Sequence, residues 1–473
     1  MTRHTGPTLG HILEALTNYR PSQEEPAVSS FVVNSRDAVA NSVFIAFRGE
    51  KADGHDYVAD AFARGATVAL VERPVAGEWP TIDARAGEAA LPDRLPVCIL
   101  VADTMRALQQ IARTWRAKFN LRIIGITGSV GKTSTKELAA AVLSRRFRTL
   151  KSEGNQNNEI GVPLTLMNLR DYHQRAVIEM GMYAQGEIAL LCDIARPSVG
   201  VVTMIGPVHL ERLGTMEAIL AAKQELVAAL PEDGVAVLNM DDPRVMSMAA
   251  HTRARVFTYG LDSGADLWAD QIQSMGLDGV RFNLHHNGES MNVRVPLLGR
   301  HSVHTALRAT AVGLVEGLGW EEIVPGLGAM SSQLRLVVIP GPRGSLLIDD
   351  TYNSSPDSAL AALNLLADLE GRHIAVLGDM LELGDAEHQA HQIVGRRAAD
   401  VADMLISVGS RARTIARQAI ATGLPADRVH MVDDAPAAVP VLEEMIQTGD
   451  VILVKGSLGM AMDRIVNSLG RLD

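Results

Sequence analysis

The chain has 473 residues, 47% hydrophobic and 21% charged, which is enough apolar material for roughly two to four domain cores. Its 55 acidic residues exceed its 44 lysines and arginines, and the resulting formal charge of -11 argues against nucleic acid as a partner. The sequence has two cysteines without metal-site spacing and no signal-peptide pattern, and no apolar run reaches the roughly 18 residues that span a bilayer. We therefore expect a cytoplasmic protein without a membrane span.

Short runs of Val, Ile and Leu alternate with longer helix-period segments, which predicts an α/β fold with helices on both faces of parallel sheets. The first strands are expected at residues 43–47 and 67–71, around a helix at 55–64. A Pro- and Gly-rich stretch at 73–96 is expected to be a loop or insertion. After it, a strand at 97–101 and a helix at 104–119 lead into a second domain.

The second domain is expected to open with a strand at 121–126 and a helix that runs to about residue 143. Its further strands are predicted at 176–180, 199–205 and 235–239. Two-period runs separated by Gly and Asn turns over 255–296 predict a small antiparallel appendage. Four later apolar runs alternate with helices and predict a doubly wound C-terminal domain, with strands at 346–349, 373–377, 404–408 and 451–454.

The most informative local motif is a glycine-rich loop between a predicted strand and a predicted helix. It reads Thr127, Gly128, Ser129, Val130, Gly131, Lys132, Thr133. Two glycines let backbone N–H groups turn toward phosphate oxygens, a helix N-terminus adds partial positive charge, and Lys132 can reach the terminal phosphates. Thr133 would hold Mg²⁺ through its hydroxyl. Residue 126 is Ile rather than Gly, so the loop is a shortened variant of the phosphate-binding motif, and the alternative is a turn with a solvated lysine.

Two candidate metal ligands follow predicted strands of the same domain. Glu179 ends the run at 176–178, and His209 follows the run that ends at residue 205. Ligands collect at the carboxyl ends of strands in such sheets, and a carboxylate suits Mg²⁺ better than an imidazole does. Each residue alone has an alternative interpretation, Glu179 as a structural carboxylate and His209 as a hydrogen-bonded core histidine.

Lys223 lies within the apolar stripe of a predicted helix at 215–230, which it shares with Ile219, Leu226 and Leu230. Its ammonium could extend along the helix to reach water. Alternatively, a lysine with a lowered pKa could react with carbon dioxide, and the resulting carbamate could bridge metal ions.

Together these motifs resemble the Mur ligase family, the ATP-dependent amide-forming enzymes of bacterial peptidoglycan synthesis. The resemblance covers nearly the whole chain. It is carried by Ser35-Arg36, Phe47-Arg48-Gly49, Asp53-Gly54-His55, TGSVGKTSTK from Thr127, GNQNNEIGVPLTL from Gly154, IEMG from Ile178, GEI from Gly186, the 209–223 segment, DDTYNSSPDS from Asp349, LGDMLELG from Leu377 and VKGS from Val454.

The resemblance implies three domains: an N-terminal UDP-substrate domain at 1–104, a central P-loop ATPase domain at 105–331 and a C-terminal Rossmann-like domain at 332–473. It implies that D-alanyl-D-alanine is added to UDP-N-acetylmuramoyl-tripeptide through an acyl phosphate. A related enzyme that couples another amino acid or dipeptide to a similar acid is the first alternative, and a nonenzymatic nucleotide sensor is the second. The third residue of the acceptor peptide and the oligomeric state have no sequence signature.

The resemblance also implies roles for individual residues. Lys132 would stabilise the γ-phosphate of ATP, Thr133 and Glu179 would hold one Mg²⁺, and His209 with carbamoylated Lys223 would hold a second. The remaining assignments are Asn157 and Asn158 near the phosphates, His301 at the adenine, Arg335 and Asp350 at the ribose or phosphates, Tyr352 and Asn353 on the dipeptide side, Lys455 and Ser457 at the second substrate or a closure contact, and Ser35 and Arg36 at the uridine diphosphate.

Several positions depart from the family pattern, namely Asn34, Ser302, His304, Leu334 and Leu458. Ser302 and His304 stand where the family favours asparagines, which weakens the case for the usual adenine contacts. Leu458 replaces an arginine that could bind a substrate carboxylate. The phosphate and metal residues are intact, so ATP chemistry is expected even if substrate preference differs. Arg335 as a solvated charge, Asp350 as part of a strand-end turn and Lys455 as an exposed lysine remain alternatives.

Overall fold

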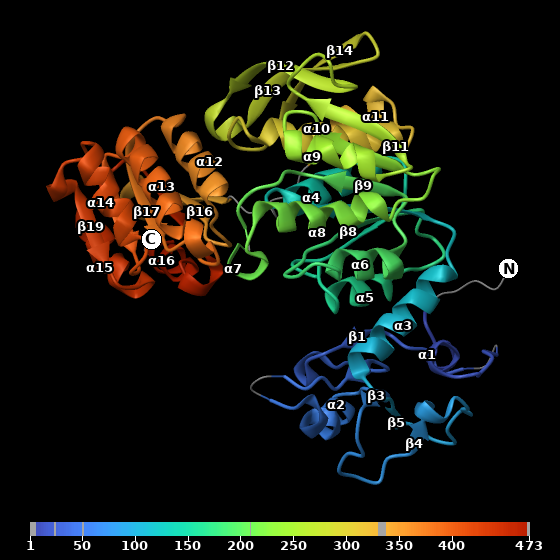
Figure 1. The fold of residues 1–473 in the computed structure, drawn as a ribbon. Coiled ribbons are helices and arrows are strands. Elements are labelled where there is room, and N and C mark those ends of the chain that lie inside the picture. The colour runs from blue at the N-terminus through green and yellow to red at the C-terminus, as the bar shows by residue number, and fades with distance from the viewer. Residues whose placement is uncertain (1–5, 23–24, 50–51, 209, 330–336, 471–473) are drawn as a thin grey trace.

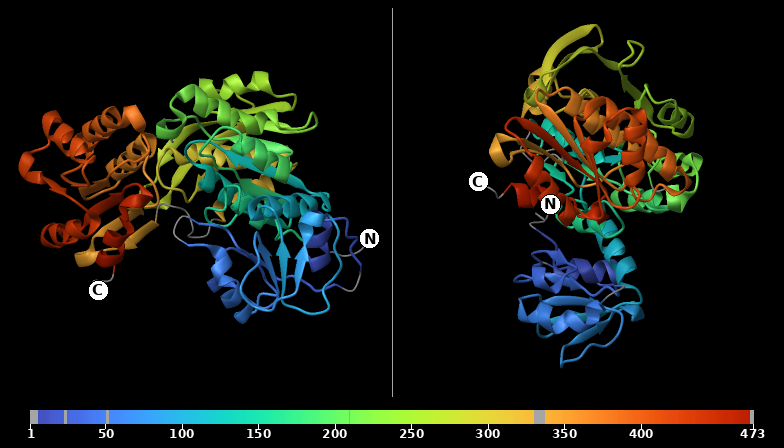
Figure 2. Two further views of the ribbon diagram at one scale, coloured as in Figure 1. Left: turned by 60° about the horizontal axis from the view of Figure 1, so that its bottom comes forward. Right: turned by 90° about the vertical axis from the view of Figure 1, so that its left-hand side faces the viewer.

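The computed structural model describes residues 6–22, 25–49, 52–208, 210–329 and 337–470, and these form three α/β units, each with its own sheet (Figure 1). The N-terminal unit is blue, the central unit runs from cyan to yellow, and the C-terminal unit is orange to red. Figure 2 shows that the central unit contacts the other two. The predicted α/β class is confirmed, whereas the exact domain boundaries stay predictions. No helix of the described segments has the length and apolar character to cross a bilayer.

Parallel strands form the N-terminal sheet, in the order β1-β2-β3-β5-β4. Their bounds are β1 Phe31–Val32, β2 Val43–Ile45, β3 Val68–Val71, β4 Thr81–Asp83 and β5 Val97–Leu100. Helices α1 (Leu9–Leu16) and α3 (Thr104–Ala117) cover one face, and α2 (Val58–Ala63) covers the other. Every residue of β2, β3 and β5 is buried, as expected for strands covered on both faces.

The central sheet has the order β14-β13-β12-β11-β10-β9-β6-β8-β7. Its strands are β6 Arg122–Thr127, β7 Thr149–Lys151, β8 Arg175–Glu179, β9 Val199–Val202, β10 Val235–Asn239, β11 Arg255–Gly260, β12 Leu267–Ser274, β13 Val280–His286 and β14 Glu289–Val295. One face is covered by α4 (Lys132–Leu143), α10 (Ser302–Val315) and α11 (Trp320–Gly328). The other is covered by α5 (Gly161–Leu166), α6 (Glu187–Ala195) and α8 (Met216–Ala228). Two short helices, α7 (Leu210–Leu213) and α9 (Pro243–Ser247), follow β9 and β10.

The C-terminal sheet has the order β15-β16-β20-β17-β18-β19 and is parallel except for β15. Its strands are β15 Val337–Pro340, β16 Leu346–Asp350, β17 Arg372–Gly378, β18 Met404–Val408, β19 Val429–Val432 and β20 Asp450–Lys455. Helices α12 (Pro356–Ala367), α13 (Glu387–Val401) and α14 (Arg413–Thr422) pack on one face. Helices α15 (Ala435–Met445) and α16 (Asp463–Leu469) pack on the other, which confirms the doubly wound arrangement.

Two local expectations need correction. The stretch at 73–96 is not only a loop, because β4 pairs with β5 and extends the sheet at its edge. The segment at 255–296 is not a separate antiparallel appendage, because β11 runs parallel to β10 and β12 pairs in parallel with β11. Only the β12–β13–β14 part is antiparallel, and it continues the central sheet.

Candidate active site

The glycine-rich loop joins the end of β6 to the start of α4, as predicted. Gly128 and Gly131 have φ angles of 141° and 83°, in the region that favours glycine. A Cβ at position 128 would lie 1.8 Å from the hydroxyl oxygen of Thr203, so this loop fits closely against the segment after β9. Gly131 provides no side-chain cap for α4. The N–H groups at the start of this 12-residue helix are therefore positioned to receive an anion.

The Lys132 side chain folds back over this loop. Its Nζ donates to the carbonyl oxygens of Gly128, at 2.8 Å, and Ser129, at 3.4 Å. The ammonium thus lies against the loop for which the sequence predicted phosphate binding. A terminal phosphate bound at the start of α4 would lie within its reach.

Glu179 connects the loop to two other predicted residues. Thr133 Oγ1 donates to Glu179 Oε2 at 2.8 Å, and Asn157 Nδ2 donates to Glu179 Oε1 at 3.0 Å. The carboxylate is buried at the end of β8. Asn158, by contrast, uses its side-chain oxygen to accept from the backbone N–H of Gly161 at 2.9 Å, and so orders the start of α5.

Lys136 is a buried cation to which the sequence analysis gave no role. It lies one helical turn after Lys132 on α4 and is completely buried. Its Nζ is 3.2 Å from Glu137 Oε1 and 4.0 Å from Glu179 Oε2, and it donates to the carbonyl of Gly154 at 3.4 Å. Its four-residue spacing from Lys132 was the available signal. Lys136 therefore lies beside the Glu179 carboxylate and links α4 to the asparagine-rich loop at residues 154–158.

Lys223 lies inside the central unit on α8, with 2% of its surface exposed. This burial excludes the interpretation in which its ammonium reaches bulk water. Burial, followed by the positive charge of Lys132, lowers the pKa of Lys223 well below its usual range. A lysine pKa lowered in this way is what the predicted reaction with carbon dioxide requires. His209 lies outside the described residues.

The donor set of this cluster fits a hard divalent cation at Thr133 and Glu179, because a hydroxyl and a carboxylate are oxygen ligands that Mg²⁺ prefers. Among the described residues there is no cluster of three His, Cys, Asp or Glu side chains that could hold a metal ion. Any Mg²⁺ here would therefore be held by Thr133 and Glu179 together with phosphate oxygens of the nucleotide.

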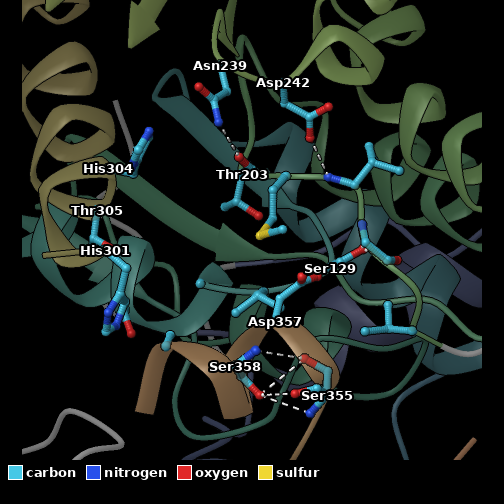
Figure 3. Close-up of a pocket in the computed structure, with 18 of the residues that line it drawn as sticks. Ser129, Thr203, Asn239, Asp242, His301, His304, Thr305, Ser355, Asp357 and Ser358 are labelled. Atoms are coloured by element: carbon cyan, nitrogen blue, oxygen red, sulfur yellow. Dashed lines mark hydrogen bonds between the residues drawn. The ribbon is translucent and has the colours of Figure 1, made fainter. Parts of the chain in front are cut away.

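A cavity of about 960 Å³ opens beside the loop, between the central and C-terminal units (Figure 3). The central unit contributes residues around Ser129 and along α10, and the C-terminal unit contributes the 350–362 segment and Lys455. Figure 3 shows His301 and His304 on one wall and Asp357 on another. The cavity is large enough for a nucleoside.

Three side chains at the start of α10, those of His301, Ser302 and His304, line the cavity. The His301 ring opens onto the cavity but is surrounded by protein, and this desolvation, followed by the charge of Arg308, lowers its pKa to about 4. His304 pairs with Asp241 at 2.8 Å, and Ser302 Oγ donates to the carbonyl of Leu298 at 2.6 Å. Both departures from the family pattern are thus accommodated by contacts within the central unit.

Burial followed by the negative charge of Asp242 raises the pKa of Asp357, which approaches the central unit at Gly206. The His301 ring of the cavity therefore carries no charge at neutral pH, and the Asp357 carboxyl has an increased tendency to protonate.

The 350–353 segment of the C-terminal unit brings three predicted residues together with Lys455. Lys455 is buried, and its Nζ donates to Asp350 Oδ2 at 2.7 Å and to the carbonyl of Asn353 at 2.8 Å. The exposed-lysine interpretation is therefore wrong. The Tyr352 hydroxyl donates to Asn155 Oδ1 of the central unit, which connects the two units.

Ser457 Oγ accepts from the backbone N–H of Leu381 at 2.9 Å and serves to hold two loops of the C-terminal unit together. Leu458, next to it, is 63% exposed. Arg335 and Leu334 lie outside the described residues.

The predicted uridine diphosphate residues lie in the N-terminal unit, away from this cluster. Asn34 Oδ1 accepts from the backbone N–H of Arg36 at 3.1 Å and caps a short 3₁₀ turn, which leaves Ser35 buried and Arg36 exposed. Asn34 therefore performs the capping that an aspartate at this position could also perform.

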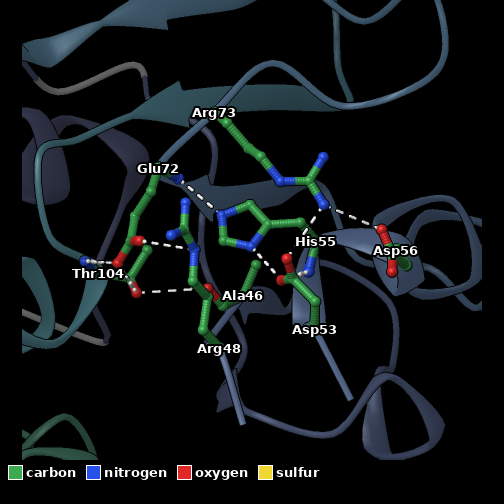
Figure 4. A network of polar contacts seen from close by, with 8 residues as sticks. All are labelled: Ala46, Arg48, Asp53, His55, Asp56, Glu72, Arg73 and Thr104. Atoms are coloured by element: carbon green, nitrogen blue, oxygen red, sulfur yellow. Dashed lines mark hydrogen bonds and ion pairs between the residues drawn. The ribbon is translucent and has the colours of Figure 1, made fainter.

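A polar network orders the neighbouring loop (Figure 4). Asp53 Oδ1 accepts from the N–H and Nδ1 of His55, and Asp53 Oδ2 accepts from Arg73. These hydrogen bonds, led by the one from the His55 N–H, hold the pKa of Asp53 well below its usual range. On its other side the buried His55 ring accepts from the N–H of Glu72 at 2.8 Å. Glu72 lies 3.4 Å from Arg48, so the network fixes the loop that carries this exposed cation.

Comparison with known proteins gives the same three-part organisation. Residues 28–116 match the Mur ligase family catalytic domain, 126–313 the Mur ligase middle domain, and 334–458 the Mur ligase glutamate ligase domain. The chain is 36% identical to the UDP-N-acetylmuramoyl-tripeptide–D-alanyl-D-alanine ligase of a Synechocystis species, over 94% of this chain and 93% of that protein. It is 35% identical to the ligase of that name from Bacillus subtilis, over 95% and 94%.

Solved structures agree with these similarities. A crystal structure of MurF from Acinetobacter baumannii has a TM-score of 0.84 and 32% identity, and covers 98% of this chain and 99% of that one. MurF from Thermotoga maritima in complex with ADP has a TM-score of 0.78 and 26% identity, with 94% and 98% covered. The chain thus shares more than 30% identity with the Synechocystis and Bacillus subtilis ligases over more than nine-tenths of its length, and it has the same fold as the solved structures. It belongs to the Mur ligase family.

Proposed function

We propose that this protein is an ATP-dependent ligase that adds D-alanyl-D-alanine to UDP-N-acetylmuramoyl-tripeptide in peptidoglycan precursor synthesis. The observation that carries the proposal is the similarity over more than nine-tenths of the chain to ligases of that name. The geometry supports it, since Lys132, Thr133 and Glu179 converge at the start of α4. We place the reaction in the cytoplasm, where ATP is supplied and where the two buried, free cysteines would stay reduced.

The chemistry begins with the tripeptide carboxylate, whose oxygen attacks the γ-phosphorus of ATP. ADP leaves, and the product is an acyl phosphate. The amine of D-alanyl-D-alanine then attacks the acyl carbon, loses a proton, and inorganic phosphate leaves as the amide forms. Phosphorylation is needed because a carboxylate oxygen is a poor leaving group at neutral pH.

The protein contributes mainly charge and position to these steps. Backbone N–H groups at the start of α4 and the Lys132 ammonium offset the negative charge of the transferring phosphoryl group. Thr133 and Glu179 would hold one Mg²⁺, which when bound neutralises and orients phosphate oxygens. Asn157, bound to Glu179, keeps an amide beside the same oxygens. The ordered 350–353 segment and Lys455 would close the site from the C-terminal unit.

The adenosine part of ATP is assigned to the cavity between the units, with the neutral His301 ring as one wall. Asp350 would contact ribose or phosphate, together with Arg335. Tyr352, Asn353, Lys455 and Ser457 are assigned to the dipeptide side, and Ser35 and Arg36 to the uridine diphosphate. The proposed domains at 1–104, 105–331 and 332–473 then supply the UDP-linked substrate site, the ATP site and the closing domain.

A second Mg²⁺ is proposed at His209 and a carbamate on Lys223. The carbamate forms when the neutral amine attacks carbon dioxide and releases one proton, and the lowered pKa of Lys223 supports this reaction. Protein equilibrated with ¹³C-bicarbonate is expected to show a carbamate carbon signal by NMR, absent from Lys223→Arg. The same spectrum for both proteins would disprove the modification.

The proposed function is tested by ADP release from the purified protein with each substrate omitted in turn. Release is expected to require both UDP-N-acetylmuramoyl-tripeptide and D-alanyl-D-alanine. No release with this pair, but release with another amine, would instead support a related ligase of different specificity. The exposed Leu458 makes the dipeptide side the first place to look for such a difference.

A further inference from the structure

Arg308 is a buried cation beside the phosphate loop that no motif in the sequence analysis includes. It lies on α10, is 5% exposed, and lines the cavity between the units. A Cβ built on Gly131 would be 3.0 Å from Arg308 Nη2, so the guanidinium lies directly against the backbone of the loop.

The hydrogen bonds of Arg308 use only part of its donor capacity. Nη2 donates to Thr305 Oγ1 at 2.9 Å, and Nη1 donates to the carbonyl of Thr203 at 3.5 Å. Nε is buried without a partner. The side-chain oxygens of Thr203 and Thr127, at the loop end of β9 and β6, are also buried without partners. Unsatisfied buried polar atoms therefore gather around one end of the phosphate loop, and such atoms call for an explanation.

The charge of Arg308 is also not balanced by a neighbouring side chain. Among the described residues no carboxylate lies within ion-pair distance of its guanidinium, while the nearby Asp241 is occupied by His304. The adjacent His301 stays neutral, partly because of Arg308. A buried cation is costly unless an anion and hydrogen bonds compensate it. In this position the available anion is the ligand of the loop.

We propose that Arg308 binds the phosphates of the nucleotide, from the α10 side of the loop and opposite the backbone N–H groups of α4. This rests on the proposed function, in which the loop binds ATP and releases ADP. A planar guanidinium with free N–H donors can bind phosphate oxygens with charge-assisted hydrogen bonds. Arg308 would hold substrate ATP and product ADP alike, and so contribute chiefly to nucleotide affinity.

The test is calorimetric titration of wild type, Arg308→Met and Arg308→Lys with ADP and with adenosine, in the absence of the other substrates. Arg308→Met is expected to weaken ADP binding about tenfold or more and to change adenosine binding less than twofold, with Arg308→Lys between. Arg300→Met, which removes the same charge from an exposed position just before α10, is expected to leave both affinities unchanged.

Equal weakening of ADP and adenosine binding by Arg308→Met would assign the residue a structural role and overturn the proposal, as would unchanged ADP binding. This result is separable from the proposed ligase function. Wild type that binds ADP but fails to join the proposed substrates would contradict the function and leave Arg308 as a phosphate ligand. Wild type that binds no ADP would overturn both.

Discussion

The phosphate loop and the cavity beside it are neighbours, but they are assembled from different parts of the chain. The loop, Glu179, Asn157 and Lys223 all belong to the central unit and are fixed by its sheet and helices. The cavity is lined by the central and C-terminal units together. The first region is complete within one unit, whereas the second exists only while two units keep their present arrangement.

This difference indicates that the two regions serve different steps, phosphoryl transfer in the first and nucleotide binding in the second. Groups that meet the transferring phosphoryl must be preorganised, because reorganising them during the reaction would add to the barrier. Groups that surround the nucleoside can be supplied by a second unit that moves during substrate entry and product release. Changes at Lys132, Glu179 and the groups bound to them are therefore expected to reduce kcat. Changes in the cavity wall, which includes Arg308, and at the contact between units are expected to act on nucleotide affinity.

The largest effect is expected from Lys132→Ala. Removing the ammonium leaves the charge of the γ-phosphate without its cation, and kcat is expected to fall by about 10³-fold. Circular dichroism is expected to be unchanged, because the Lys132 ammonium donates to carbonyl oxygens of its own loop and the β6 and α4 elements on either side of it are retained. Lys118→Ala, which removes a lysine paired with Glu14 in another part of the molecule, provides the control. Near-normal turnover of Lys132→Ala would remove the loop from the mechanism.

Glu179→Gln is expected to have the next largest effect. The amide keeps the shape of the side chain but loses the negative charge, and kcat is expected to fall about 100-fold, with a higher Mg²⁺ concentration needed for half-maximal activity. The measurement is ADP release over a Mg²⁺ titration. Glu232→Gln, which removes an exposed carboxylate paired with Arg253, is expected to show the wild-type Mg²⁺ requirement. An unchanged requirement in Glu179→Gln would contradict the proposed metal ligand.

Lys136→Met tests whether the buried cation positions Glu179. Met fills a similar volume, but it removes the charge near Glu179 and the bond to the carbonyl of Gly154. The Mg²⁺ concentration needed for half-maximal activity is expected to rise about tenfold, and kcat is expected to recover partly at saturating Mg²⁺. A change in melting temperature without any change in the Mg²⁺ requirement would show that Lys136 has only a structural role.

The sequence was most informative where chemistry and local structure coincide. The loop at 128–131 could be placed because a buried strand before it and a helix after it are both visible as patterns, and the structure has β6 and α4 there. Lys223 stood out because a charge interrupted an apolar stripe, and it is indeed buried. Lys136 offered only its four-residue spacing from Lys132 as a signal, because its position depends on contacts with β8 and the 154–158 loop, which no periodicity reveals.

Other features could not be predicted because they arise from pairing between distant segments. Strands β4, β7 and β15 have three or four residues each and lie at sheet edges, where burial imposes little pattern. The parallel pairing of β11 with β10 was missed because alternating residues give no information on strand direction. The role of Arg308 depends on the packing of α10 against the loop, and a single arginine in a helix gives no signal of that contact.

The smallest effect is expected at the contact between the two units. Tyr352 belongs to the C-terminal unit, and its hydroxyl donates to Asn155 in the loop that also carries Asn157. Tyr352→Phe removes this hydrogen bond and keeps the ring. A hydrogen bond of this kind contributes about 0.5–1.5 kcal/mol, so kcat/KM for ATP is expected to fall by a factor of roughly 2 to 13.

The difference between the two regions predicts whether the lower kcat/KM of Tyr352→Phe comes from kcat or from KM. If the contact helps to hold the cavity closed, Tyr352→Phe raises KM for ATP and leaves kcat within about twofold, because the groups around the phosphoryl stay in place within the central unit. Steady-state kinetics with saturating acceptor and dipeptide measure both constants. Tyr172→Phe, at an exposed tyrosine of the central unit, is the matched control. A fall in kcat at constant KM would instead mean that the asparagine-rich loop is ordered by the C-terminal unit, and that the phosphate end of the site is not complete within one unit.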